Sequence, residues 1–124
     1  MYGMFVNDNG CIHYALLLAC GIKTIETRNR NMLSALVGQR VAIVRTHREK
    51  NPTVVGYVTI TGSMFCKAED FSKYENQHYV MPGSKYAPQD GKGKWFYFCE
   101  DAEICDHYPL PKDAVRHGRS WCEF

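Results

Sequence analysis

The sequence contains no long hydrophobic run and no basic residue near its start. No apolar stretch approaches the roughly 20 residues that a membrane-spanning helix needs, so none is expected. Residues 17–20 (LLAC) resemble the end of a bacterial lipoprotein signal, but such signals begin with basic residues, and the first Lys or Arg here is Lys23. Asp8 and His13 also lie upstream, where that signal would be apolar or positive. We therefore interpret the segment as part of a helix and expect a soluble, cytoplasmic protein with no membrane partner.

The chain also lacks a Cys-x-x-Cys motif, although it has six cysteines. An even number would permit disulfide bonds, but Cys20, Cys66 and Cys99 lie among apolar neighbours, where a free thiol behaves as a small hydrophobic group. Thiols also stay reduced in the cytoplasm, so we expect free cysteines. We also expect no metal and no cofactor. A zinc site is the alternative, and near-stoichiometric zinc in the purified protein would favour it. The residues that could form it have spacings that match no common zinc motif: Cys99, Cys105, His107, His117 and Cys122.

Internal repeats, low-complexity tracts and linkers are missing as well. A chain of 124 residues without them is expected to form a single domain, residues 1–124. Its charge is unevenly distributed: residues 1–62 hold seven basic and three acidic residues, a net +4, whereas the remainder holds eight and ten, a net −2. A basic half favours a polyanionic or phosphate-bearing partner, although solvated surface charge explains so modest an imbalance nearly as well.

A helix is expected over residues 10–20. Apolar residues recur there at helical spacing, and Gly21 is well placed to end the helix. The helix is apolar on most sides, which predicts that it is largely buried. His13, on this apolar helix, is predicted to be a hydrogen-bonded core histidine and not a ligand.

The remaining pattern predicts an α+β domain. Strands are expected where Val, Ile, Tyr and Thr are frequent or apolar residues alternate: residues 4–6, 23–28, 40–46, 53–61, 95–99, 102–108 and 120–124. Helical segments are expected at 32–37 and 68–76, a hairpin loop at 47–52 and a long loop at 81–94. Six or seven short, mostly antiparallel strands with two or three helices predict a small β-barrel flanked by helices.

The segment GIKTIETR, residues 21–28, concentrates charge directly after the apolar helix. Charged groups close to a core must be paired, hydrogen-bonded or solvated in a cleft. On a strand, Thr24, Glu26 and Arg28 share one face, and Lys23 at the turn can point towards the same opening. The cluster is either the start of a functional cleft or an ion-pair cluster that secures a strand edge, and the residues alone leave both open.

Two basic segments accompany this cluster. In the long loop, Lys85, Tyr86 and the triplet 92–94 (KGK) mix cations, glycine and an aromatic ring, which suits a phosphate chain and a stacked base. Tyr86 is the best stacking candidate, because the aromatic run 95–98 is expected in the core. A second basic set surrounds the hairpin at 47–52: Arg45, His47, Arg48 and Lys50. A flexible loop and a solvated surface are the alternatives.

The apolar helix, Gly-x-Lys-Thr-Ile-Glu-x-Arg at 21–28, Val-Gly-Gln-Arg-Val-Ala-Ile at 37–43 and the strand Val-Val-Gly-Tyr-Val-Thr-Ile at 54–60 together resemble the ASCH domain family. The resemblance covers residues 3–62 well and the rest loosely. It implies the PUA-like fold, a small β-barrel flanked by helices. It further implies a cleft beside the barrel that binds RNA or a nucleotide-like ligand.

The resemblance also implies roles for individual residues. Lys23, Glu26 and Arg28 match the cleft-facing positions of the family motif, and we expect Lys85, Tyr86 and His47 to contribute to ligand binding. Some ASCH proteins are hydrolases that remove acetyl from N4-acetylcytidine, with a threonine where this chain has Glu26; others are linked to RNA cleavage. The alternative to a binding protein is therefore a hydrolase centred on Lys23 and Glu26, with Thr24 as a nearby hydroxyl. An adaptor for a protein partner is a third hypothesis.

Overall fold

The computed structural model describes residues 1–47 and 50–124, and the side chains of residues 47–50 lie outside the described part. Seven strands form one sheet in the order β2-β5-β4-β3-β1-β7-β6. All neighbouring pairs are antiparallel except β1 and β3. The strands are β1 (Tyr2–Asn7), β2 (Ile25–Arg28), β3 (Arg40–His47), β4 (Lys50–Cys66), β5 (Lys94–Pro109), β6 (Val115–His117) and β7 (Trp121–Glu123). The helices are α1 (Tyr14–Ala19), α2 (Glu75–His78) and the 3-10 helices η1 (Ser34–Leu36) and η2 (Ala68–Tyr74).

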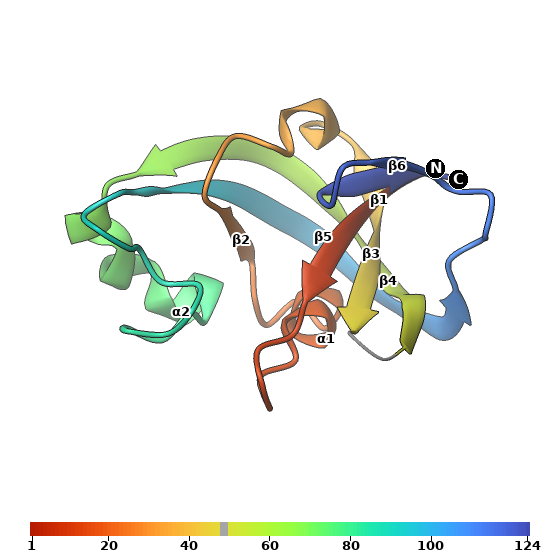
Figure 1. The fold of residues 1–124 in the computed structure, drawn as a ribbon, viewed down its shortest axis with the longest axis horizontal. Helices are drawn as coiled ribbons and strands as arrows, with labels where there is room; N and C mark the ends of the chain where they lie inside the picture. Colours follow the sequence, from red (N-terminus) through yellow and green to blue (C-terminus); the bar gives the residue numbers. More distant parts are fainter. Residues whose placement is uncertain (48–49) are drawn as a thin grey trace.

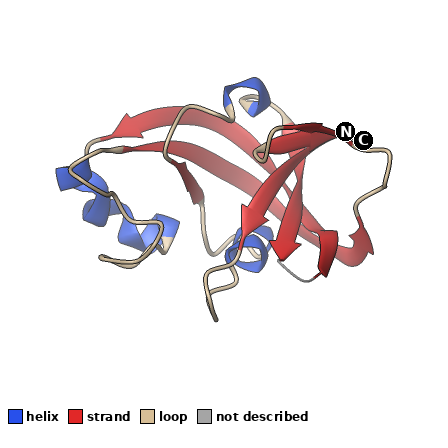
Figure 2. Cartoon of the chain, in the orientation of Figure 1, coloured by secondary structure: helices blue, strands red, loops and turns tan. Residues whose placement is uncertain are grey.

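The sheet curls into a half-barrel with β2 and β6 at its edges. Figure 1 shows β4 and β5 arching side by side across the molecule, with α1 and α2 beneath the arch. The pairing of these two strands shifts register at three places along their length. Each shift bends the strands and increases their twist, because one strand carries an extra residue. The chain ends meet at one side of the curl, where the Phe124 amide donates to the Met1 carbonyl over 2.8 Å (Figure 2).

The larger core cluster lies inside the curl, between the sheet and α1. Gly56 of β4 allows the close approach, because a Cβ there would lie 2.8 Å from the Ala19 Cβ of α1 and 2.3 Å from the Glu103 carbonyl oxygen of β5. The helix buries its apolar side chains against β3, β4 and β5, which explains why it is apolar on most sides. Fully buried residues on the strands include Met4, Ile43, Val58, Ile60 and Phe96.

The predicted α+β architecture and the mostly antiparallel sheet are confirmed. The expected strands 95–99 and 102–108 form one continuous strand, β5, and the expected helix 68–76 is η2 followed by α2. The sequence pattern missed β6. The predicted hairpin loop 47–52 includes residues 48–49, which lie outside the described residues.

The prediction for His13 was wrong. The helix expected at 10–20 begins only at Tyr14, because Asn9 and Ile12 pair with each other in a short bridge ahead of it. His13 therefore precedes the helix with its side chain 55% exposed, and its Nδ1 lies 3.1 Å from the Asp8 carboxylate. Among the histidines whose burial the structure describes, the buried one is His78, at the end of α2.

The cysteines are all free thiols, three of them buried. Within residues 1–47 and 50–124, no cluster of three His, Cys, Asp or Glu side chains is arranged to hold a metal ion. None of the helices in the same ranges has the length and apolar character needed to cross a bilayer.

Candidate functional site

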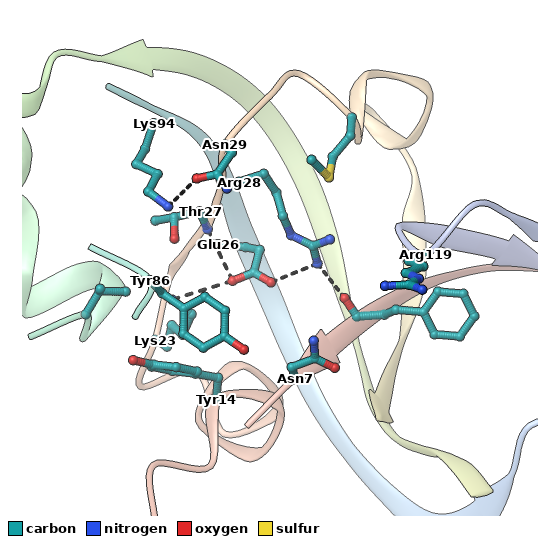
Figure 3. Close-up of a pocket in the computed structure, with 13 residues that line it drawn as sticks. Asn7, Tyr14, Lys23, Glu26, Thr27, Arg28, Asn29, Tyr86, Lys94 and Arg119 are labelled. Carbon is teal, nitrogen blue, oxygen red and sulfur yellow. Dashed lines mark hydrogen bonds and ion pairs between the residues drawn. The ribbon is translucent and has the colours of Figure 1, made fainter. Parts of the chain in front are cut away.

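A cavity of about 200 Å³ opens beside edge strand β2, inside the mouth of the curl. Figure 3 shows that its side chains come from segments far apart in the chain: β1, α1, β2, the loop 81–93, the start of β5 and the turn before β7. Four basic side chains and one carboxylate lie among them. The lining residues are Phe5, Asn7, Tyr14, Lys23, Glu26, Thr27, Arg28, Asn29, Met32, Val80, Tyr86, Lys94 and Arg119.

Lys23 reaches the cavity because of how α1 ends. Gly21 adopts a left-handed conformation at φ +75°, and the amides of Ile22 and Lys23 both donate to the Leu17 carbonyl, which turns the chain towards β2. This confirms the glycine stop predicted from the sequence.

The Lys23 ammonium is buried, with only 1% of the residue exposed. Its Nζ donates to the His78 carbonyl over 2.5 Å, lies 3.6 Å from Glu26 Oε1 and stands 4.9 Å from the centre of the Tyr14 ring. Burial lowers the pKa of Lys23, and the Glu26 carboxylate opposes that shift. Lys23 therefore loses its proton at a lower pH than an ordinary lysine does.

Glu26 is held between two cations. Its Oε2 accepts from Arg28 Nη2 over 3.0 Å, and its Oε1 accepts from the Thr27 amide over 3.2 Å and faces Lys23. Glu26 and Arg28 lie two residues apart on β2 and share a face, as the alternation predicted. Arg28 Nη2 also donates to the Phe5 carbonyl of β1 over 2.5 Å. Because β2 and β1 are not neighbours in the sheet, Arg28 spans the interior of the curl.

Two tyrosines form the aromatic wall of the cavity. The rings of Tyr14 and Tyr86 meet edge to face, with their centres 6.0 Å apart. Tyr14 comes from α1 and is buried, and burial raises its pKa while the Asn9 side chain opposes the shift. Tyr86 comes from the long loop and is half-buried, so one part of its ring remains available to a ligand.

Several cavity residues escaped the sequence-based prediction. Lys94 Nζ donates to Asn29 Oδ1 over 2.5 Å, which joins the start of β5 to the end of β2. Burial lowers the pKa of Lys94, and Glu26 opposes the shift. Asn7 and the exposed Arg119 complete the opposite side. The sequence carried a weak signal for Lys94, through the basic triplet 92–94, and none for Asn7 or Arg119.

The structure brings together Lys23, Glu26, Arg28 and Tyr86 but not Thr24 or Lys85. The backbone of Thr24 bonds to Gln77 and Cys99, and its side chain does not line the cavity; the threonine that does is Thr27. Lys85 Nζ lies over the Tyr86 ring, 5.3 Å from its centre, but Lys85 is not a lining residue. The His47 side chain lies outside the described residues.

His78 holds the segment that carries the Lys23 acceptor. Its Nε2 donates to the Phe71 carbonyl over 2.8 Å, and its Nδ1 accepts from the Val80 amide over 2.9 Å. The ring also stacks on Phe71 at 4.0 Å between centres. Burial lowers the pKa of His78 from 6.5, the Phe71 hydrogen bond opposes the shift and the Lys23 charge adds to it. A proton on Nδ1 would remove the acceptor for Val80, so the fold favours the neutral ring.

We expect the protein to lose stability on acidification below pH 6.5 because of His78. The unfolded chain protonates His78 at about pH 6.5, and the folded chain protonates it only at a lower pH. The free energy of unfolding therefore decreases as the pH is lowered through that window. One proton contributes a slope of up to about 1.4 kcal/mol per pH unit. Urea denaturation between pH 7 and 5 measures the slope. The His78→Gln variant should be less stable at all pH values, but its free energy of unfolding should depend less steeply on pH, by the contribution of one proton. An unchanged slope would contradict the assignment to His78.

The fold is shared with solved ASCH structures from Zymomonas mobilis. A serine-to-alanine variant of that protein matches with a TM-score of 0.75 at 16% identity, over 98% of this chain and 87% of the other. A tyrosine-to-phenylalanine variant matches with a TM-score of 0.68 at 19% identity, over 87% of this chain and 76% of the other. A further ASCH structure from that organism matches with a TM-score of 0.65 at 16% identity, over 90% of this chain and 89% of the other. No protein-family model and no curated protein matches the sequence. The chain therefore has the fold of these ASCH structures, as its sequence predicted.

Proposed function

We propose, from the ASCH-type fold and the charged cavity beside β2, that this protein binds the base of an RNA or of a modified nucleoside. The observation that carries the proposal is the Glu26 carboxylate, fixed between Lys23 and Arg28 and facing a cavity with the Tyr86 ring as its wall. At about 200 Å³, the cavity is smaller than the roughly 300–1,000 Å³ of pockets for drug-sized ligands, which suits a single base or nucleoside.

The chemistry of the lining groups fits a base with both donors and acceptors. A carboxylate only accepts hydrogen bonds, so Glu26 would accept from an exocyclic amine. Lys23 and Arg28 only donate and would bind carbonyl oxygens; Arg28 uses Nη2 for its bonds to Glu26 and Phe5, and its other guanidinium nitrogens remain for a ligand. Tyr86 would stack on the base, as aromatic side chains do in proteins that bind single-stranded nucleic acid.

A hydrolase is the second candidate, and a specific observation favours it. Lys23, with its lowered pKa, lies 3.6 Å from Glu26, a pairing that could move a proton. The acetylcytidine hydrolases that the sequence resembles use a threonine at the position of Glu26. Here the aliphatic hydroxyl that lines the cavity is that of Thr27, one residue further along, so Thr27 and not Thr24 is the candidate nucleophile.

Removal of Arg119 is expected to weaken ligand binding about tenfold without affecting the fold. Arg119 is exposed and lines the cavity, and a charged hydrogen bond contributes about 1.5–3 kcal/mol, or somewhat less where water competes. Calorimetric titration of the wild type and Arg119→Ala with the four ribonucleosides, N4-acetylcytidine and short RNAs measures the change. Lys112→Ala is the control, because Lys112 is an exposed cation in the turn before β6 that does not line the cavity.

The same mixtures separate binding from turnover. Product release from N4-acetylcytidine or RNA, lost in a Thr27→Val variant that still binds, would favour the hydrolase. Binding without product would favour the binding protein. Absence of binding by any nucleoside or RNA to the wild type would overturn the proposal and leave the protein-adaptor hypothesis.

A further inference from the structure

A second cavity, of about 340 Å³, adjoins the first. Asn29 and Lys94 line both, so the hydrogen bond between them forms the wall that the two cavities share. Lys94 is 5% exposed, and its ammonium therefore belongs to the interior and not to the open surface. The other charged residues of the second cavity are Arg30, Lys92 and Asp90.

The cations of the second cavity are available to a ligand. Arg30 and Lys92 are exposed, and within the described part of the chain neither makes an ion pair or a side-chain hydrogen bond. Binding an anion would therefore break no interaction that either side chain makes with the described residues. With Lys94 they outnumber the single carboxylate, Asp90, which makes the cavity suited to an anion.

The backbone around Lys92 is fixed in place by Gly93. A Cβ at Gly93 would lie 2.3 Å from the Cys66 carbonyl oxygen and 2.5 Å from the Phe65 ring, so only glycine permits this contact with the end of β4. The close packing holds Lys92 and Lys94 on either side of one residue, next to Asn29 and Arg30 at the end of β2. The basic triplet at 92–94 is thus part of a built surface beside the first cavity.

We propose that the natural ligand is a single-stranded nucleic acid of at least two nucleotides and not a free nucleoside. This inference rests on the proposed function, in which the first cavity holds one base. The strand that follows the base crosses the wall formed by Asn29 and Lys94, and its phosphodiester is bound by Arg30 and Lys92 in the second cavity. A base that enters the first cavity must be unstacked and unpaired, which favours a single strand over a duplex.

A comparison of one nucleoside with its own oligomer tests this inference. The probes are the nucleoside that binds best and the RNA hexamer made of that nucleotide, titrated into the wild type, Arg30→Ala/Lys92→Ala and the control Lys67→Ala/Lys112→Ala. The control removes two exposed cations outside both cavities.

We expect the hexamer to bind the wild type at least tenfold more tightly than the nucleoside. The Arg30→Ala/Lys92→Ala variant should lose about tenfold in hexamer affinity and nothing in nucleoside affinity. The slope of log K against log salt concentration should weaken by about 0.7, the value for one neutralised phosphate of a single strand. The control should match the wild type.

Three results would overturn the inference. A hexamer no tighter than the nucleoside would do so while the proposed function stands. Equal losses in the variant and the control would mean general charge attraction. A hexaglutamate peptide that binds as tightly as RNA and needs Arg30 and Lys92 would mean an acidic protein partner. Absence of binding by nucleoside and hexamer alike would remove the proposed function itself.

Discussion

Replacing Glu26 with glutamine is expected to lower the free energy of unfolding by about 3 kcal/mol, since removal of one partner from a buried ion pair typically costs 3–5 kcal/mol. Glu26 is 7% exposed and is the acidic partner of both Lys23 and Arg28. The neutral amide leaves Lys23 charged in an apolar interior. Because burial already lowers the pKa of Lys23, the lysine can give up its proton in the variant, which keeps the loss at the lower end of that range.

Urea denaturation of Glu26→Gln, Lys23→Met and the double variant measures this interaction. If the loss arises from the stranded ammonium, Glu26→Gln should cost about 1–3 kcal/mol less in the Lys23→Met background than in the wild type. Glu103→Gln is the matched control, because Glu103 pairs with Arg40 over 2.8 Å but is 61% exposed, and exposed pairs contribute about 0–1 kcal/mol. Equal losses at Glu26 and Glu103, or full additivity with Lys23→Met, would contradict a buried ion-pair cluster.

The sequence predicted those parts of the site that depend on local structure. Gly21 indicated the end of the helix, and the alternation after it indicated that Glu26 and Arg28 share a face of the strand. Both follow from the conformation of a few adjacent residues, because glycine adopts positive φ readily and a strand repeats every two residues. Tyr86 was predicted for a similar local reason, as an aromatic residue within a polar loop.

The remainder of the site depends on how the sheet curls, which no local pattern encodes. Arg119 lies on the turn before β7, and it lines the cavity only because β7 pairs with β1 at the far side of the sheet. Lys94 lies beside Asn29 because β5 pairs with β2 from its first residues, with Arg28 opposite Trp95. Thr24 and His13 do not lie where the sequence pattern placed them, because that pattern does not fix the first residue of an element. The strand β2 begins at Ile25, after Thr24, and the helix α1 begins at Tyr14, after His13.

Lys23→Met is expected to reduce ligand affinity about 10- to 100-fold, the factor that corresponds to a lost charged hydrogen bond of about 1.5–3 kcal/mol. The free energy of unfolding should fall by about 1–3 kcal/mol, because methionine fills the space but leaves the buried His78 carbonyl without its donor. Glu26 keeps Arg28 and the Thr27 amide as partners in this variant. Calorimetric titration and urea denaturation of the same preparation separate the two effects. Unchanged affinity of the folded variant would mean that Lys23 serves only the fold.

The pH dependence of affinity gives a second measurement on Lys23. If its ammonium donates to the ligand, affinity should fall as the pH rises through its pKa, which burial places below 10.5. Folded-state stability should move in the opposite direction there, because the unfolded chain still binds this proton and deprotonation relieves the cost of burying the charge. Lys23→Met should show neither change. If ligand turnover instead rises with pH over that range and disappears in Lys23→Met, the neutral amine is the active form, and the hydrolase is the better description of this site.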